Sequence, residues 1–445
     1  MINTRDIKYI IISMFFWGIV IGSYYISSNL CVLFLICMMV WSFFYLKKNS
    51  LVFGIKVLFA MFYMGSLCLS VMKLVGIYQV TWSLSTWLLF FLFFEFFYLG
   101  YFVSISKKEN IVSKLRKYVI MQGKRINILY TFFVMFSFLA LFGFLYCVSI
   151  SGYIPLFSKD VYSYIEFGNG SDLAIFYQIT VILPAIGLYL LKRRKRNQFF
   201  IGLLVCLDVI ICVCVKSRDF FVGMIIVTAC MFYYEYALMK NGKLKRKSKA
   251  MMLFAVIIVG VFFLWISAQR GYSDSYIRRV YKAEDSPLPD SLVAPYVYIT
   301  SGFYNFDILV KKLDFHTFGL MTASPILILF HIMPLRELSS QYMEMLKQYY
   351  IIPELNLFSS LGVPYIDGGC LGIILTGLLS GYIYSILEIN YRKYKDAFSL
   401  ILYAIGIHHV VMCFFTSWIS SFQYFIYAIL MVAGVMLTQN QEKIR

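Results

Sequence analysis

Long apolar runs recur along this chain and are separated by short polar segments. A run of about 20 residues, folded as a helix that rises 1.5 Å per residue, is long enough to cross a hydrocarbon layer of roughly 30 Å. The pattern therefore predicts an all-α polytopic membrane protein with about twelve transmembrane helices. The runs lie at residues 7–26, 30–46, 52–72, 84–105, 127–150, 173–191, 198–215, 220–239, 250–268, 366–388, 397–416 and 418–437.

One long hydrophilic interruption, residues 269–367, separates two of these runs. Within it, residues 318–335 are mostly apolar but contain two prolines and His331. We interpret this stretch as a re-entrant or membrane-resting segment, because a full span there would move the basic cluster at 392–395 to the outer side. Apolar positions at helical spacing follow as far as Tyr349, which predicts an amphipathic helix at the outer surface.

Composition and charge support the membrane assignment and predict which side of the membrane each loop faces. Hydrophobic residues make up 61% of the 445 and charged residues 14%, with a mean hydropathy of +0.77; soluble domains have roughly 45–50% and 25%. The net charge of +18 does not indicate nucleic acid, because the basic residues cluster in the short segments between runs. Cytoplasmic loops collect Lys and Arg. Most of the 40 Lys and Arg residues fall inside when both termini are cytoplasmic, and the long interruption then faces out.

The remaining composition points to no metal centre and no second domain. The ten cysteines lie almost wholly in apolar runs and have no spacing typical of zinc ligands, so we interpret them as small hydrophobic residues. Internal repeats and low-complexity linkers are not evident. We therefore expect one integral membrane domain, residues 1–445, with a large outer loop at 269–367, and no cofactor.

The first candidate site opens that loop. Arg270, Asp274 and Arg278 follow one another at four-residue spacing and would share a face of a helix, with Arg279 beside them. The guanidinium fork matches phosphate oxygens bidentately and stays charged, so this cluster predicts a phosphate or diphosphate site. Alternatively, Asp274 simply pairs with its arginines on a solvated helix.

The second candidate is the short hairpin 216–219, which contains Lys216 and Arg218 on the outer side, against the usual distribution of positive charge. Arg218 precedes the span that starts at Phe220, where the amides of a helix N-terminus add positive potential for an anion. The alternative is a hairpin whose basic side chains reach the lipid headgroups.

The third candidate surrounds Asp367, where the chain re-enters the membrane. Asp367 is expected to cap the helix or to face a cavity, and the glycines at 372, 377 and 381 are expected to permit close helix packing. His316, in the outer loop, is the preferred base among the four histidines. The acids Glu95, Asp208 and Glu235 lie within spans and form either a proton path or hydrogen bonds that hold the bundle.

Several of these features together resemble a known family. They are the number of spans, the late outer loop, the Ser217-Arg218 hairpin, the segment from Tyr298 through Gly302 to Asn305-Phe306, and Tyr365-x-Asp367-Gly368-x-x-x-Gly372 leading into a span. In layout the whole chain resembles the Wzy-type polymerases of bacterial oligosaccharide repeat units, which build O-antigen, the outer part of lipopolysaccharide, or capsule.

The resemblance implies a GT-C-like, metal-independent glycosyltransferase at the outer face of the bacterial inner membrane. Such an enzyme transfers a growing glycan from undecaprenyl diphosphate to the next lipid-linked repeat unit, and a chain-length regulator protein is a further partner. According to this resemblance, the diphosphate would be bound by Arg218, Arg270, Arg278 and Arg279. The acceptor would be activated or oriented by Asp274, His316 and Asp367.

Two other functions remain open from the sequence. A flippase or other transporter of lipid-linked sugar would use Glu95 and Asp208 as coupling acids, although the long outer loop is unusual for that class. An O-antigen ligase would share the architecture and the diphosphate site, but it would use a lipid A core as its acceptor.

Overall fold

The computed structural model describes most of the chain as helices. The described residues are 3–47, 54–112, 122–158, 160, 163–168, 173–237, 278–352, 355–394, 396–417 and 420–440. Within these ranges the one β-type pairing is an isolated parallel bridge between Ser359 and Thr416. The all-α class predicted from the sequence is confirmed for this part of the chain.

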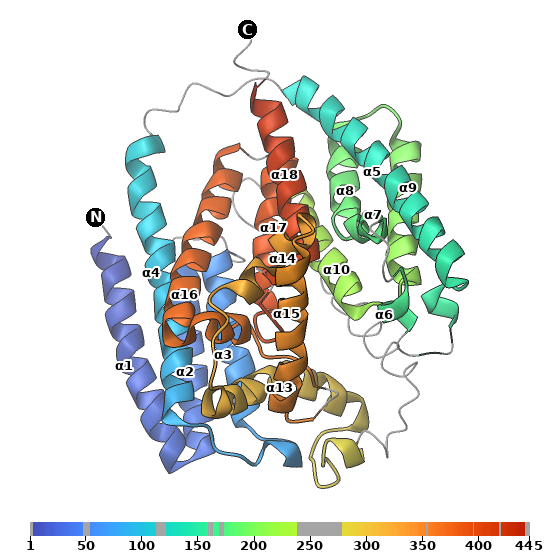
Figure 1. The fold of residues 1–445 in the computed structure, drawn as a ribbon. Coiled ribbons are helices and arrows are strands. Elements are labelled where there is room, and N and C mark those ends of the chain that lie inside the picture. The colour runs from blue at the N-terminus through green and yellow to red at the C-terminus, as the bar shows by residue number, and fades with distance from the viewer. Residues whose placement is uncertain are drawn as a thin grey trace. The chain divides into compact units, whose positions relative to one another are not determined.

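Contacts divide the chain into two compact units. The first is formed by residues within 1–116, 273–392 and 409–425, and the second by residues within 117–272, 393–408 and 426–445. Each unit gathers segments that are far apart in the sequence, which the range of ribbon colours in Figure 1 makes visible.

The first unit contains α1 (Thr4–Ile26), α2 (Ser28–Lys47), α3 (Ile55–Val71), η1 (Gly76–Tyr78), α4 (Leu84–Val112), α13 (Asp290–Lys312), α14 (Leu320–Leu329), α15 (Met333–Leu346), η5 (Lys347–Tyr349) and most of α16 (Gly362–Tyr394). The second contains α5 (Gln122–Ser151), η2 (Pro155–Phe157), α6 (Ser163–Glu166), α7 (Ala174–Gln178), η3 (Ile179–Val181), α8 (Leu183–Arg193), α9 (Gln198–Cys214), α10 (Arg218–Phe232) and the π-helix η4 (Tyr233–Ala237). Both units take part of α17 (Ala397–Val411) and of α18 (Phe422–Asn440).

The described residues include five helices that are long and apolar enough to cross a membrane, namely α1, α2, α4, α5 and α16. A sixth crossing is possible if the segments 174–181 and 183–193, which meet at an angle of 53°, form one broken span. Every predicted run coincides with a helix or a helical pair except 250–268, which lies outside the described residues. The structure is thus compatible with a membrane-embedded protein.

In the first unit, aromatic and small residues set the packing of the long helices. Tyr9 of α1 stacks on Trp41 of α2 at 5.1 Å between ring centroids, and its hydroxyl donates to Ser42. Where α16 crosses α4, a Cβ atom on Gly377 or Gly381 would overlap the α4 backbone. The prediction of close helix packing is therefore confirmed for Gly377 and Gly381, whereas the close neighbour of Gly372 is Pro364 of α16 itself.

The polar segment after residue 290 folds against these helices and is built around α13, which packs on α3 and α4. Asp307 of α13 caps the start of α4. Its carboxylate accepts hydrogen bonds from the amide of Ser83 at 2.9 Å and from the hydroxyl of Thr86 at 2.7 Å, and pairs with Lys311 at 2.5 Å. A buried carboxylate is thereby satisfied, and the start of α4 is fixed on α13.

The apolar stretch 318–335 becomes a helical hairpin of α14 and α15. The predicted helix leading up to Tyr349 is confirmed as α15 with η5. Large apolar side chains stay exposed along the hairpin, including Phe318 at 91% and Phe330 at 68%. This exposure fits a membrane-contacting segment, while its depth in a bilayer stays a prediction.

In the second unit, buried acids hold helices together. The hydroxyl of Ser137 on α5 donates to Asp208 on α9 at 2.9 Å. Glu235 pairs with Lys192 at 3.2 Å and Arg193 at 2.9 Å. In the first unit the hydroxyl of Ser13 on α1 donates to Glu95 on α4 in the same way. These contacts favour the interpretation in which the membrane acids hydrogen-bond the bundle.

Candidate functional site

Asp367 lies at a break within α16 and caps a different helix from the one we expected. Gly368 and Gly369 interrupt the helical backbone directly after it, and Gly369 has a φ of 55°. The Asp367 carboxylate accepts hydrogen bonds from the amides of Met321 at 3.0 Å and Thr322 at 2.8 Å, both in α14. The hydroxyls of Thr317 and Thr322 donate to it as well, each at 2.5 Å. The carboxylate therefore fixes the N-terminus of α14 on α16.

His316 lies beside the same break. The amide of Thr317 donates to the carbonyl of Ile366 at 3.0 Å, and the amide of Phe318 donates to that of Asp367 at 2.9 Å. The His316 ring is exposed, its Nδ1 is 3.3 Å from the carbonyl oxygen of Ile366, and a Cβ atom on Gly369 would lie 3.2 Å from the ring. The structure thus brings together two predicted site residues that are far apart in the sequence, and it leaves the imidazole accessible.

Arg278 is engaged within its own loop. Its guanidinium pairs with Asp290 and donates to the carbonyl oxygens of Ala283 at 2.7 Å, Glu284 at 3.3 Å and Leu288 at 3.1 Å. These contacts close the turn that precedes α13, so a bound anion would have to displace some of them. The neighbouring Arg279 is exposed. Arg270 and Asp274 lie outside the described residues.

Arg218 is the first residue of α10, as the sequence suggested, and Ser217 precedes the helix as its N-cap residue. Lys216 has a φ of 59°, and its ammonium donates to the carbonyl of Ser158 at 3.2 Å. The hairpin is therefore a tight turn that places Arg218 at a helix N-terminus, whereas Lys216 is buried. It belongs to the second unit, whereas His316, Asp367 and Arg278 belong to the first.

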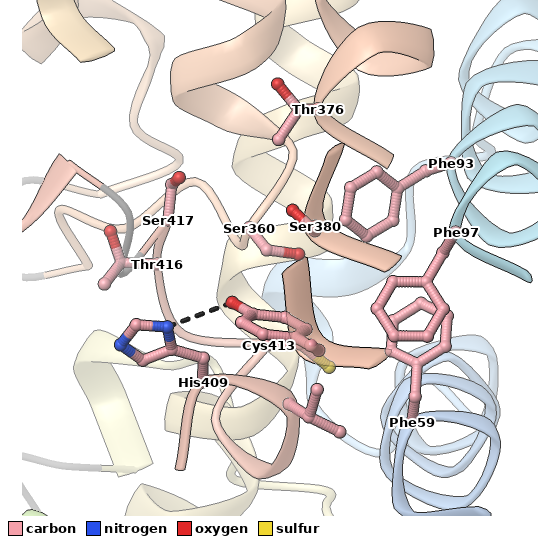
Figure 2. Close-up of a pocket in the computed structure, with 12 residues that line it drawn as sticks. Phe59, Phe93, Phe97, Ser360, Thr376, Ser380, His409, Cys413, Thr416 and Ser417 are labelled. Carbon is pink, nitrogen blue, oxygen red and sulfur yellow. Dashed lines mark hydrogen bonds between the residues drawn. The ribbon is translucent and has the colours of Figure 1, made fainter. Parts of the chain in front are cut away.

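A cavity in the first unit was not anticipated from the sequence. Figure 2 shows the rings of Phe59, Phe93 and Phe97 on one side of it and Thr416, Ser417 and His409 on the other. A hydrogen bond of 3.0 Å joins the phenol oxygen of Tyr384 to Nδ1 of His409, and it is the dashed line at His409 in Figure 2. The complete lining is Phe59, Phe93, Phe97, Ser360, Thr376, Ser380, Tyr384, His409, Val410, Cys413, Thr416 and Ser417.

Two non-helical segments, 355–361 and 412–417, form part of this lining. The run 397–416 was predicted as helix throughout, but α17 ends at Val411. The chain then turns so that the Cys413 carbonyl accepts a hydrogen bond from the amide of Ser360 at 2.8 Å, next to the bridge between Ser359 and Thr416. The predicted helix is shorter because this tertiary pairing replaces its last turn. Irregular backbone in membrane proteins is tolerated where it lines a polar cavity or is buried in protein.

α13 holds the segment 355–361 in place. The buried side-chain amide of Asn305 donates to the carbonyls of Leu355 and Leu357, the latter at 2.7 Å, while its oxygen accepts from the amide of Ile351 at 2.8 Å. Gly302 leaves room for both segments, because a Cβ atom there would lie 2.5 Å from the Phe414 carbonyl oxygen and 2.7 Å from the Ser359 nitrogen. The region from Gly302 to Asn305 therefore holds one wall of the cavity in place.

The sequence did contain a signal for this cavity. Thr376, Ser380 and Tyr384 follow one another at four-residue spacing and lie along one side of α16. What the sequence lacked was the partner, because only folding brings the segments at 360 and 409–417 opposite that side. Charged side chains are absent from the lining, as far as the described residues go. The cavity therefore offers hydroxyl groups, one imidazole and an aromatic wall.

Comparison with known proteins gave no relative: no family model, curated protein or solved structure matches the chain. Within the described residues, no group of three or more His, Cys, Asp and Glu side chains is arranged to hold a metal ion.

Proposed function

We propose that the chain is a membrane-embedded glycosyltransferase that polymerises undecaprenyl-diphosphate-linked oligosaccharide repeat units for a surface polysaccharide. In this proposal the chain has about twelve spans and a GT-C-like arrangement in the bacterial inner membrane, with its termini in the cytoplasm. The observation that carries the proposal is the exposed His316 held beside the α16 break at 366–369. This arrangement offers a base that an acceptor hydroxyl can reach.

The proposed chemistry divides the roles between a base and cations. His316 would accept the proton of the acceptor hydroxyl as that oxygen attacks the anomeric carbon of the donor glycan. The candidates for stabilising the negative charge on the departing undecaprenyl diphosphate are Arg218, at the N-terminus of α10, and Arg270, Arg278 and Arg279. Asp274 is a further candidate for the acceptor. Asp367 acts here as a positioning residue, because its oxygens already hold α14.

The test is the glycan profile of a strain that lacks this chain and is complemented with variants of it. Arg218→Ala and His316→Ala are expected to abolish long glycan chains and to leave single-unit material. Arg218→Lys keeps the charge but not the bidentate fork, so it is expected to retain only part of the activity. Lys347→Ala, at an exposed position on η5, is the control and should give a normal ladder. A normal ladder from alanine variants of Arg218, Arg270 and Arg278 alike would reject the diphosphate assignment.

A transporter of lipid-linked sugar is the second candidate, and one observation favours it. The bent pair of segments 174–181 and 183–193 resembles the discontinuous helices that many transporters place at their binding sites. Purified protein in liposomes with lipid-linked repeat units separates the two functions. Elongated product supports the polymerase, whereas translocation without elongation supports the transporter. An O-antigen ligase would elongate nothing until a lipid A core acceptor is added.

A further inference from the structure

The cavity at Tyr384 and His409 has the properties of a water site. Its volume is about 30 Å³, which is room for about two water molecules and far less than a sugar ring needs. The Ser360 hydroxyl oxygen, which lines it, is buried and has no hydrogen-bond partner among the described residues. A buried hydroxyl without a partner is costly, and a bound water removes that cost.

The lining also favours water over an ion as the resident occupant. Within the described part of the chain, the titratable groups that line the cavity are Tyr384 of α16, His409 of α17 and Cys413 in the turn after α17. The Tyr424 ring of α18 lies 5.2 Å from that of His409. Since none of these groups carries a fixed charge, nothing in the lining neutralises a bound ion. His409 is the one group among them whose side chain becomes positively charged when it takes up a proton.

We propose that this cavity is a hydrated proton site, in which His409 takes up a proton from bound water through the hydroxyl of Tyr384. In the neutral imidazole with its proton on Nε2, the phenol donates to Nδ1 across the 3.0 Å hydrogen bond. A protonated water passes a proton to the phenol oxygen while the phenol proton moves to Nδ1. The products are water, neutral Tyr384 and an imidazolium, so protons and charge balance.

This proton site is separate from the proposed transferase site, whose base is His316 in the polar segment after residue 290. Ser360 from one irregular segment and Ser380 from α16, both drawn in Figure 2, offer hydroxyl groups in the lining that can orient the water. A buried histidine in a water-filled membrane cavity is a recurrent component of proton relays. The inference therefore concerns proton movement and holds for either of the two candidate functions.

Hydrogen exchange at the imidazole Cε1–H tests the proposal, because this exchange requires a protonated ring and contact with solvent. The purified full chain is incubated in D2O over a range of pH, and mass spectrometry reads the four histidines separately. We expect His409 to exchange with a sigmoidal pH profile and to exceed its neighbour His408, which is buried and does not line the cavity. The exposed His316 is the fast reference. If His409 exchanges no faster than His408, the cavity is dry and the proposal is overturned.

Matched variants test the water and the relay separately. Ser360→Val fills the cavity with an apolar group and is expected to slow exchange at His409 severalfold, whereas Ser360→Ala removes one polar partner but leaves the space open and should slow it less. Tyr384→Phe removes the hydroxyl and keeps the ring, so it should displace the midpoint of the His409 profile. An unchanged midpoint would overturn the relay. In each variant an unaltered His316 profile and gel-filtration volume establish that the protein is folded.

Discussion

At the scale of single residues, Asp367 is the position where the contacts decide most between a chemical and a structural role. The sequence placed an acid where a span begins, which suits a helix cap as well as an acceptor-orienting group. In the structure, four donors from the segment 317–322 surround its carboxylate. Because these donors occupy both carboxylate oxygens, the contacts favour the structural role.

Replacing Asp367 therefore tests stability first. We expect Asp367→Ala to lower the free energy of unfolding by about 2 kcal/mol, because the α14 amides lose their cap and two threonine hydroxyls lose their acceptor. Thermal unfolding of the purified protein in detergent measures this change. Asp314→Ala, at an exposed acid in the same segment, is the control and should unfold like wild type. If Asp367→Ala unfolds like wild type and still makes no long glycan, the acid has a direct chemical role.

The contacts of Arg278 could not be predicted from its spacing in the sequence. Four-residue spacing suggested that it shares a helix face with Arg270 and Asp274, but its guanidinium closes the turn at 283–290. The sequence could not reveal this, since the carbonyl oxygens that it binds are main-chain atoms with no residue signature. His316 is the opposite case, because its type suggested a base and folding placed it beside the α16 break with its ring exposed.

At the scale of elements, the contact between α4 and α16 depends on glycines that the sequence had marked. Gly381→Ala is expected to destabilise the protein by about 1–3 kcal/mol, because the new Cβ atom overlaps the carbonyl oxygen of Phe97 and the two helices must separate. The displacement would also disturb Phe97 and Ser380, which line the cavity.

The control for this prediction is a glycine in a helix with open space around it. A Cβ atom on Gly22 of α1 meets nothing within 4 Å, so Gly22→Ala should be neutral or should stabilise the helix by about 0.5–1 kcal/mol. Thermal unfolding of both variants in the same detergent gives the comparison. Equal unfolding of the two would mean that α4 and α16 do not approach as closely as the structure has them.

At the scale of the whole molecule, the charge pattern predicts a topology that reporter fusions can test. With both termini cytoplasmic, a fluorescent protein fused after Arg445 should be fluorescent, and a periplasmic phosphatase inserted at the exposed residues 284–285 should be active. The phosphatase is also fused after Arg445. If it is active at that position and inactive at 284–285, the number of crossings is odd. In that case the α14–α15 hairpin or another segment crosses the membrane, and the proposed placement of His316 would change.

The sequence by itself determined the helical class, the approximate limits of the helices and the glycines that permit close packing, because apolar runs and small residues act through local periodicity. Only the tertiary structure decided which polar groups meet. It ended α17 early, bound Asp367 to α14, turned Arg278 inward and placed His409 against Tyr384 across a small cavity. Apart from Arg278, whose partners lie in its own loop, these pairings join residues far apart in the chain. They form because buried polar groups must find partners wherever folding brings them together.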